Sequence, residues 1–269
     1  MGIPTVLGHG AFIGSETLRV TAGPFSIGAY PVGPQPSRLP SHGHSNAHFM
    51  FAIGGEYFSE AERADAGRDV QLIYNPAQVF HRDQFRKGPA SFVSLSIDDS
   101  LADALAEWRA PTVPIAVVDA GVRRAWNRLL AVCAQGLGPA EIDVAVMELL
   151  AQFAVGPREQ PSTGWLKRAK EILDEAPTMA IRDVAKEVGI HPFHLCRAFR
   201  EAYGCSPTAF RSQRRLESAM AAMTSSRRLG EIAQDAGYFD QSHLVKEFRG
   251  KLGVAPSKFS ALLARPNLA

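Results

Sequence analysis

An internal repeat in the last third of the chain constrains the fold more than any other feature of the sequence. Each copy has small and apolar residues at matching positions, then a glycine, a Leu/Phe pair and a Gly-x-x-Pro-x-x-Phe segment. The offset between the copies is 48 residues up to the glycine and 49 residues after it, so the second copy has one additional residue in its turn. A repeat of this kind marks two copies of one supersecondary unit. The first copy contains Val184, Ala185, Gly189, Leu195, Phe199, Gly204, Pro207 and Phe210, and the second contains Ile232, Ala233, Gly237, Leu244, Phe248, Gly253, Pro256 and Phe259.

Each copy predicts a pair of helices joined by a glycine turn. Apolar residues with helical spacing precede Gly189, and Leu195 and Phe199 follow it at i, i+4. Glycine adopts the left-handed conformation of such a turn without a steric clash. This arrangement is typical of the helix-turn-helix. The alternative interpretation is a purely structural helical array, which predicts no affinity for DNA.

Basic residues are concentrated around the repeat. Residues 1–163 contain 12 Lys and Arg against 16 Asp and Glu, whereas residues 164–269 contain 17 against 11. The whole chain nevertheless carries a net charge of only +2. A positive charge confined to one part of a chain favours a negatively charged partner for that part. Together with two matched helix pairs, the charge favours double-stranded DNA.

The first hundred residues have a different periodicity. Short runs rich in β-branched and aromatic residues alternate with Gly and Pro turns, and they predict strands at 25–30, 49–53, 70–74 and 93–97. Short strands with such turns indicate an all-β sandwich or barrel. A helical period follows, and it predicts helices at 101–108, 120–135 and 139–154, the last two forming a hairpin broken at 136–139.

We therefore predict an α+β protein with two domains. Residues 1–154 form a β-barrel domain with the helical hairpin, residues 155–164 have the Pro, Gly and polar composition of a linker, and residues 165–269 form an all-α domain. No apolar run reaches the roughly 18 residues of a membrane-spanning helix, and the first ten residues lack a secretory signal, so we expect a cytoplasmic protein without a membrane partner. The three cysteines are widely spaced, which argues against a disulfide framework or a thiolate zinc site.

Residues 165–263 resemble the AraC/XylS family of bacterial transcription regulators. The resemblance rests on the two helix-turn-helix units, on the joining segment 210–223, and on the segment 237–259, which is close to the family's signature. It implies a sequence-specific regulator whose two recognition helices enter successive major grooves of DNA. It also implies an N-terminal domain that binds an effector and forms a homodimer, with RNA polymerase as a further partner.

The residues predicted to contact DNA lie on the second helix of each unit and face away from the core. By the resemblance, the base readers of the first unit are Phe193, Cys196 and Arg197, although Cys196 departs from the polar residue often found there and a packing role is its alternative. Arginine can bond both acceptors of guanine, and phenylalanine can contact a thymine methyl group. Tyr238 and Phe239 are expected to pack against the turn. In the second unit, helical geometry leaves Gln241, Ser242, His243 and Lys246 toward DNA, while Arg211, Arg214 and Arg215 are predicted to contact phosphates or to remain solvated charges.

Residues 40–48 and 76–81 resemble the cupin pattern, in which His-x-His, an acidic residue and a later Pro-x-Gly-x-x-His meet in a small jelly roll. Here His48 stands at the acidic position and Gln78 at the glycine. A divalent metal such as Zn, Ni, Cu or Fe is one expectation, because imidazole suits these ions. A metal-free pocket for a small organic effector is the other, and Asp83 or Arg82 could serve in either. The candidate ligands are His42, His44, His48 and His81.

The broad apolar face of the hairpin at 120–154 predicts either a cover for one end of the barrel or a dimer interface. The sequence contains no carboxylate pair, no nucleophile with a placed base and no phosphate loop, so we predict no catalytic residue. A second hypothesis for the function is a metal-dependent cupin enzyme with a helical accessory domain. Metal content together with turnover of a substrate would discriminate the two functions.

Overall fold

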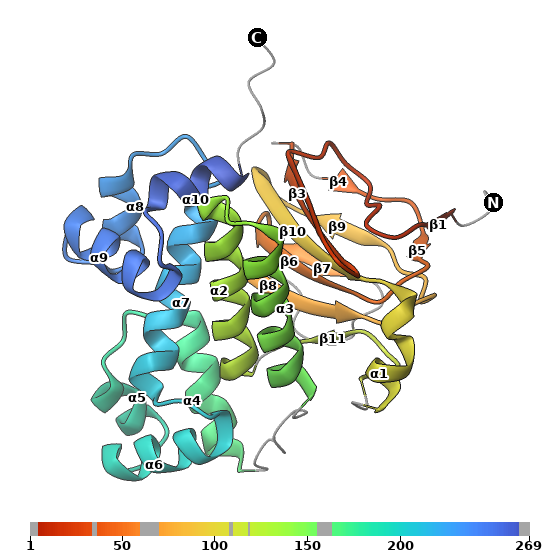
Figure 1. The fold of residues 1–269 in the computed structure, drawn as a ribbon. Helices are drawn as coiled ribbons and strands as arrows, with labels where there is room; N and C mark the ends of the chain where they lie inside the picture. Colours follow the sequence, from red (N-terminus) through yellow and green to blue (C-terminus); the bar gives the residue numbers. More distant parts are fainter. Residues whose placement is uncertain are drawn as a thin grey trace.

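The computed structural model describes residues 5–33, 37–59, 70–107, 110–117, 119–154 and 163–263. The β-strands and three short or paired helices occupy the part before residue 155, and the part after residue 162 is helical (Figure 1). Of the predicted linker at 155–164, only the last two residues are described. No helix in the described part of the chain has the length and hydropathy needed to cross a membrane.

Three sheets make up the N-terminal part. The largest has six strands in the order β11-β8-β6-β10-β3-β2, and its neighbouring strands are antiparallel. A three-stranded sheet has the order β4-β9-β7, and β1 pairs in parallel with β5. The bounds are β1 Thr5–Leu7, β2 Leu18–Ala22, β3 Phe25–Val32, β4 Ser37–Arg38, β5 His42–His44, β6 His48–Gly54, β7 Tyr57–Ser59, β8 Val70–Asn75, β9 Asp83–Phe85, β10 Ala90–Ile97 and β11 Ile115–Ala116.

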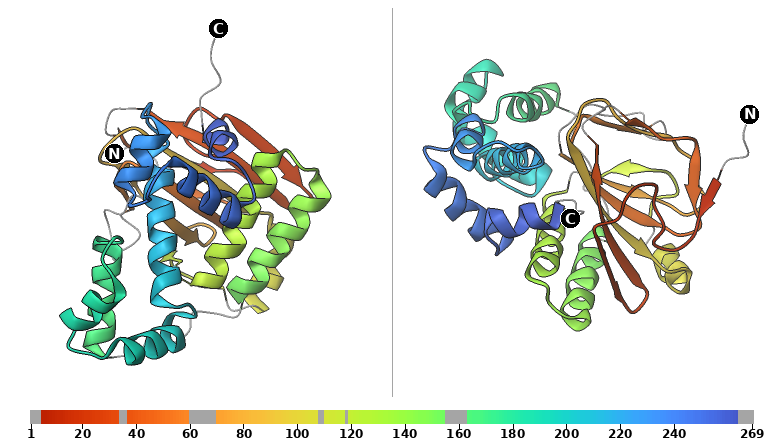
Figure 2. Two further views of the ribbon diagram at one scale, coloured as in Figure 1. Left: turned by 90° about the vertical axis from the view of Figure 1, so that its left-hand side faces the viewer. Right: turned by 90° about the horizontal axis from the view of Figure 1, so that it is seen from above.

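The four predicted strands are confirmed, since each lies within β3, β6, β8 or β10. The structure contains a barrel-like arrangement in which the smaller sheets stand opposite one face of the large sheet (Figure 2, right). An apolar core fills the space between them, and it includes Met50 and Ala52 of β6 with Tyr57 and Phe85 of the smaller sheet. The more specific assignment to a cupin jelly roll stays a prediction.

A helical hairpin covers the other face of the large sheet. It consists of α2 (Ala120–Gln135) and α3 (Pro139–Ala154), which confirms the two predicted helices. Asp119 caps α2 by accepting hydrogen bonds from two backbone N–H groups, and Gly136 ends it with a φ of 68°. Trp126 of α2 is fully buried and contacts the rings of Phe49 and Phe51. The alternate side chains of β6 therefore pack on opposite faces of the sheet, as strand geometry requires.

The C-terminal part contains the two predicted helix-turn-helix units. A short 3-10 helix (Asp99–Leu101) and α1 (Ala102–Glu107) precede the hairpin, and seven described helices follow it. The first unit is α5-α6, the second is α8-α9, and α7 joins them. The joining helix begins at Pro207, three residues before the prediction, because Ser206 caps it and proline suits the first helical position. The bounds are α4 Gly164–Glu175, α5 Ile181–Glu187, α6 Pro192–Tyr203, α7 Pro207–Ala222, α8 Leu229–Asp235, α9 Gln241–Leu252 and α10 Pro256–Leu263.

The two units differ in how they pack against the rest of the molecule. Helices α7 to α10 share one continuous core with the hairpin and the large sheet, and α2 contacts both α9 and α10. Helices α4 to α6 instead form a separate small core around Leu166, Leu173, Leu195 and Phe199. In Figure 2 (left), α4 to α6 extend away from the hairpin, whereas α9 lies against it. A cavity of about 730 Å³ lies between the hairpin and the side of α4 and α7 that faces it.

Buried charges connect the two parts of the chain. Glu217 of α7 is 2% exposed and accepts hydrogen bonds from Arg123 of α2 and from Arg214 and Gln213 of its own helix. Burial by itself raises the pKa of Glu217, but the charges of Arg123 and Arg214 outweigh it and hold the pKa below its usual value. The carboxylate is therefore ionised, and it holds α7 against the hairpin.

Candidate nucleic-acid interface and histidine cluster

The turns of the two helix-turn-helix units have the same backbone geometry up to the residue after the glycine. Gly189 and Gly237 have φ values of 69° and 77°. The N–H of Ile190 donates to the carbonyl of Ala185 at 2.9 Å, and the N–H of Tyr238 donates to that of Ala233 at 2.8 Å. Positive φ at these positions explains the glycines, because other residues pay a steric cost there. Each turn then leads into a capped second helix, α6 or α9.

The outer face of α6 carries the three residues predicted to read bases in the first unit. Phe193 is 74% exposed although it is apolar, Arg197 is exposed, and Cys196 is half-buried. The guanidinium of Arg197 forms an ion pair with Glu201 at 3.0 Å, and both side chains are well exposed. Leu195 and Phe199 are fully buried on the opposite face. The structure thus places Phe193 and Arg197 where a partner can reach them.

The outer face of α9 carries the residues predicted for the second unit. Gln241, Ser242, His243 and Lys246 are all exposed, and Gln241, Ser242 and Lys246 line a shallow hollow together with Arg249. Arg249 extends this polar face by one helical turn, and the sequence analysis did not include it. Its i, i+3 spacing from Lys246 was the available signal.

The three arginines of α7 have internal partners, which the sequence analysis did not foresee. Arg211 donates to the carbonyl of Met179 at 2.8 Å, and Arg215 donates to that of Ala236 at 3.3 Å and lies 4.4 Å from the ring of Tyr238. Arg214 is 13% exposed and forms ion pairs with Asp174 and Glu217. The charge of Arg214 is therefore neutralised by internal carboxylates, and we assign this residue to the packing of the helices and not to a phosphate contact. Arg211 and Arg215 connect α7 to the first and second units, respectively.

Two aromatic residues at the start of the second unit behave differently from each other. Tyr238 is buried and packs against the turn, as expected. Phe239 was expected to do the same, but it is 88% exposed. The expectation for Phe239 was therefore wrong. The physical reason is that the chain bends at Phe239 and Asp240, and only Tyr238 packs against Arg215 and joins the core.

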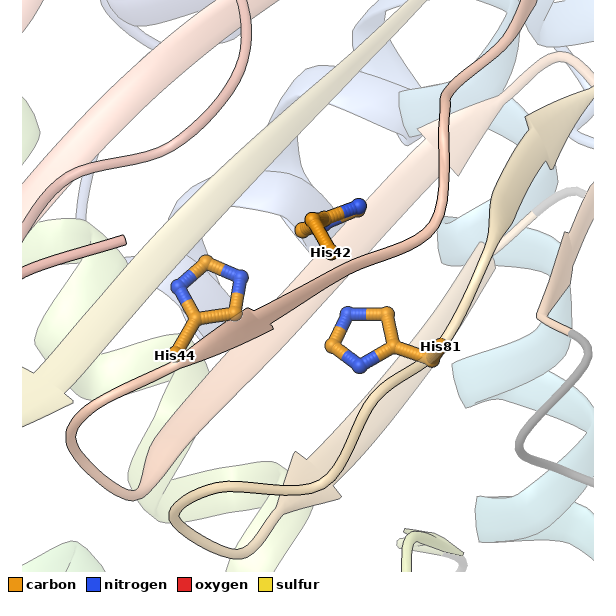
Figure 3. A group of neighbouring side chains, drawn as sticks. All are labelled: His42, His44 and His81. Atoms are coloured by element: carbon orange, nitrogen blue, oxygen red, sulfur yellow. The ribbon is translucent and has the colours of Figure 1, made fainter. Parts of the chain in front are cut away.

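Three of the four candidate histidines come together inside the barrel. His42 and His44 lie on β5, two residues apart and therefore on one face, and His81 pairs with the backbone of His42. Their possible ligand nitrogens lie within 4.8 Å of one another, and all three residues are buried (Figure 3). The Nδ1 atoms of His42 and His81 donate to the carbonyls of Pro40 and Val79. These bonds direct each Nε2 atom toward the centre of the cluster.

Asp83 joins this cluster, and His48 does not. One carboxylate oxygen of Asp83 lies 3.6 Å from Nε2 of His42 and 3.5 Å from Nε2 of His81, while Tyr57 donates to the other oxygen at 2.5 Å. His48 is occupied elsewhere, since its Nε2 lies 3.1 Å from the amide nitrogen of Asn75. The acidic member of the set thus follows His81 in the sequence instead of standing at the position of His48. We call His42, His44, His81 and Asp83 the histidine cluster.

The histidine cluster contains one neutral imidazole beside a histidine–aspartate pair: burial by itself lowers the pKa of His81, but the hydrogen bond and charge of Asp83 outweigh burial and raise the pKa of His81. Burial, reinforced by the charges of His81 and His42, lowers the pKa of His44 to about 3, so His44 is neutral. Its Nε2 atom is buried and has no hydrogen-bond partner among the described residues. A buried unpaired nitrogen is costly unless something binds it. The three imidazoles form a donor set that zinc and related divalent metals accept, and Asp83 lies beside two of them, so the residues present fit a metal ion.

Comparison with known proteins agrees with the helical part of the structure. A helix-turn-helix domain model matches residues 184–261. The transcriptional regulator ExsA of Pseudomonas aeruginosa is 27% identical over 149 residues, and the match covers 48% of this chain and 54% of ExsA. The chain therefore matches about half the length of this curated relative.

Two solved structures match this chain at low similarity. ToxT of Vibrio cholerae O395 has a TM-score of 0.38 at 11% identity, covering 90% of this chain and 99% of ToxT. The C-terminal domain of AraT, a response regulator of Geobacillus stearothermophilus, has a TM-score of 0.37 at 20% identity, covering 40% of this chain and 92% of that domain. Both TM-scores lie below 0.5, so neither match establishes the fold of this chain.

The repeated turns, the exposed outer faces of α6 and α9 and the basic charge define the C-terminal part as a double helix-turn-helix, a class of DNA-binding module. More particularly, the helix-turn-helix domain match lies within this part of the chain, and the relative matched over part of its length is a transcriptional regulator.

Proposed function

We propose that this protein is a sequence-specific transcription regulator that binds double-stranded DNA through α6 and α9 and responds to an effector in its N-terminal barrel. The observation that carries the proposal is the presence of two helix-turn-helix units whose second helices expose polar and aromatic side chains on one side and bury matched Leu and Phe residues on the other. Such a regulator acts in the cytoplasm and has RNA polymerase as a further partner.

The proposal assigns base reading to the exposed faces of α6 and α9. Arg197 reads guanine, because its fork of donors matches the two acceptors in the major groove. Phe193 contacts a thymine methyl group, and Cys196 lies beside it as a neutral neighbour. Gln241, Ser242, His243 and Lys246 read the second major groove, and Arg211 and Arg215 lie close enough to the two turns to support phosphate contacts as well as internal ones.

Selection of binding sites from a random double-stranded DNA library with the full chain tests this function. We expect a bipartite site whose two parts lie about one helical turn apart, and an affinity that falls as salt rises. Binding that is equally strong to every sequence would contradict a sequence-specific regulator. An absence of binding would favour the structural helical array.

For the effector, we propose a divalent metal held by the histidine cluster. A metal there supplies a positive charge that neutralises Asp83 and satisfies Nε2 of His44. The protein residues hold the ion, bury it and exclude water, and the metal changes DNA binding only if it favours one arrangement of the two domains. The effector lies on the barrel side of the large sheet, and α7 packs on β6 and β8 from the other side. The large sheet therefore connects the effector site to the joining helix α7.

Metal analysis of the purified full chain tests the effector, provided that no chelating step is used. We expect close to one metal ion per chain, a clear loss in His44→Ala and Asp83→Asn, and little change in His48→Ala or in the exposed control His194→Ala. A chain without stoichiometric metal and without a thermal shift on adding zinc, nickel or copper would leave a small organic effector as the candidate.

The proposal also includes a homodimer formed through α3. Val144 is 63% exposed and Met147 is exposed on the same side of this helix, and Ala140 and Ala151 continue the stripe at helical spacing. Exposed apolar side chains in one row favour a partner surface. Sedimentation of the full chain tests this part, and we expect Val144→Asp to convert a dimer to a monomer.

A further inference from the structure

The additional residue of the second repeat can be identified from the structure. Ile190 and Tyr238 make the same backbone hydrogen bond, at the 48-residue offset. The residues that cap the second helices, His191 and Asp240, correspond at the 49-residue offset. The one residue without a counterpart in the first unit is therefore Phe239, which lies between Tyr238 and Asp240.

Phe239 is also the most exposed large apolar side chain in the described part of the chain, at 88%. Its backbone is nevertheless held on both sides. The preceding residue, Tyr238, is buried against Arg215, and the following residue, Asp240, accepts a hydrogen bond from the N–H of His243 at 2.7 Å. The N–H of Phe239 itself donates to Nδ1 of His243 at 3.4 Å. The side chain is thus presented to solvent by a fixed backbone, directly before α9.

We propose that Phe239 is a specificity-determining residue that contacts a thymine methyl group in the major groove occupied by α9. This inference rests on the proposed function and extends it to a residue that the base-reading set did not contain. The N-terminal end of a recognition helix is the part that approaches base edges, and Phe239 immediately precedes that end. The thymine methyl group is the apolar feature that a base pair presents in the major groove, so it is the base atom an apolar ring selects.

The neighbours of Phe239 agree with this placement. Gln241 and Ser242 are exposed one and two residues into α9, on the face proposed to read the second groove. Phe193 occupies a related place in the first unit, at the second position of α6, and it is 74% exposed. One exposed phenylalanine therefore lies near the start of each recognition helix, Phe193 inside α6 and Phe239 two residues before α9, although the two do not correspond in the repeat. The second unit obtains its aromatic contact from the additional residue.

The experiment compares the full wild-type chain with Phe239→Ala, Phe239→Leu and the control Val113→Ala, which removes another strongly exposed apolar side chain in the N-terminal part. The binding site is first selected from random DNA with the wild type. Each variant is then titrated on that site, on the same site with deoxyuridine in place of thymidine in the part bound by the second unit, and on unrelated DNA. Deoxyuridine lacks only the methyl group, so it isolates the proposed contact.

We expect Phe239→Ala to lose roughly ten-fold in affinity on the selected site and little on unrelated DNA, with Phe239→Leu between it and the wild type. Deoxyuridine at one position should weaken the wild type about three- to five-fold and leave Phe239→Ala unchanged. Val113→Ala should behave as the wild type. Thermal unfolding of Phe239→Ala should match the wild type, since an exposed ring adds little to stability.

Three results would overturn the inference. Unchanged affinity and an unchanged selected sequence for Phe239→Ala would mean that the ring serves a contact with another protein. Equal losses on the selected and unrelated DNA would indicate a contact with the DNA backbone. Failure of the wild type to select any sequence would overturn the proposed function itself, and this outcome is distinguishable because it appears before any variant is compared.

Discussion

The first helix-turn-helix unit packs around a small core of its own, whereas the second shares the core of the N-terminal part. Leu195 and Phe199 of α6 contact only residues of the first unit and its neighbouring helices, while Leu244 and Phe248 of α9 belong to the core that includes Trp126 of the hairpin. The same repeat pattern therefore produces two different environments, because α2 packs directly against α9 and a cavity separates the hairpin from the side of α4.

This difference implies a direction for signalling. A change in the hairpin reaches α9 through its direct contact with α2, whereas α6 packs against α4, α5 and α7. We therefore expect an effector to alter the second unit more than the first. Coupling of this kind needs a physical contact with two arrangements, and the contact of α2 with α9 and α10 is the candidate.

The largest expected effect comes from removing the matched core phenylalanine of each unit. Phe199→Ala and Phe248→Ala each delete a fully buried ring, and each should lower the free energy of unfolding of its own core by about 3–5 kcal/mol. Phe199→Ala should reduce hydrogen-exchange protection in α4 to α6 alone. Phe248→Ala should reduce it in α8 to α10, the hairpin and β6 together. Equal loss of protection throughout the chain in both variants would show that the two cores unfold as one.

A slightly smaller effect is expected from the buried charge that joins α7 to the hairpin. Glu217→Gln leaves Arg123 and Arg214 without their carboxylate, so we expect a loss of about 3 kcal/mol of unfolding free energy. The pKa of Glu217 is lowered in the folded protein, so its stabilising contribution is complete above the unfolded value near about 4.3. This contribution of Glu217 is lost as the pH falls below the unfolded pKa and then through the lower pKa that Glu217 has in the folded protein.

Thermal unfolding between pH 7 and pH 3 measures this dependence. The wild type should lose stability more steeply than Glu217→Gln below about pH 4.3. Glu201→Gln serves as the control, because Glu201 is an exposed glutamate on α6 far from the hairpin. Parallel pH profiles for the wild type and Glu217→Gln would contradict an ionised Glu217 as the connection between the parts.

Local signals predicted the individual elements well, and the packing of the units could not be read from them. Asp119 and Gly136 mark both ends of α2, and the glycines of the repeat mark both turns, so these elements followed from neighbouring residues. The separate core of the first unit depends instead on which helices meet in space. The partners of Arg214 are an example, since Asp174 lies 40 residues before it and Glu217 is buried only because α2 covers it.

The histidine cluster shows the same limit. The spacing of His42 and His44 was sufficient to place both side chains on one face of a strand. The exchange of His48 for Asp83 was not predictable, because it depends on the isolated bridge that pairs His81 with His42 of β5. Asp83 stood two residues after His81 and was noted in the sequence, but only the register shows which oxygen meets which imidazole.

An effect of intermediate size is expected to distinguish alanine substitutions at the two turn glycines, Gly189 and Gly237. A Cβ atom added at Gly189 would have no atom within 4 Å. Gly189→Ala should therefore lower the free energy of unfolding by about 1 kcal/mol, because of the positive φ alone. An alanine Cβ at Gly237 would lie 2.5 Å from Cγ2 of Thr178, so Gly237→Ala must also displace the segment before α5. We expect its cost to be about 2–3 kcal/mol by thermal unfolding. If Thr178→Ala does not relieve the difference between the two variants, the contact of the Gly237 turn with the segment before α5 is not its cause.

The smallest expected effect concerns the ion pair that restrains Arg197 in the first unit. Arg197 and Glu201 are 71% and 64% exposed, and an exposed pair at i, i+4 contributes only about 0.3–0.5 kcal/mol, so Glu201→Gln should leave stability unchanged.

The effect of Glu201→Gln on DNA binding should be larger than its effect on folding. The substitution removes a negative charge from the surface proposed to face the DNA phosphates, and it releases Arg197 to bind guanine. We expect tighter binding, by about two- to five-fold at low salt and less at high salt, confined to sites that contain the guanine read by the first unit. On α9, Lys246 has no ion-pair partner among the described residues, and Glu247 lies beside His243, Ser212 and Lys251 instead. Glu247→Gln should therefore loosen these contacts and give no comparable gain. Titrations of both variants on the selected site and on a site lacking that guanine measure the comparison, and a gain that persists without the guanine would assign Arg197 to the phosphate backbone.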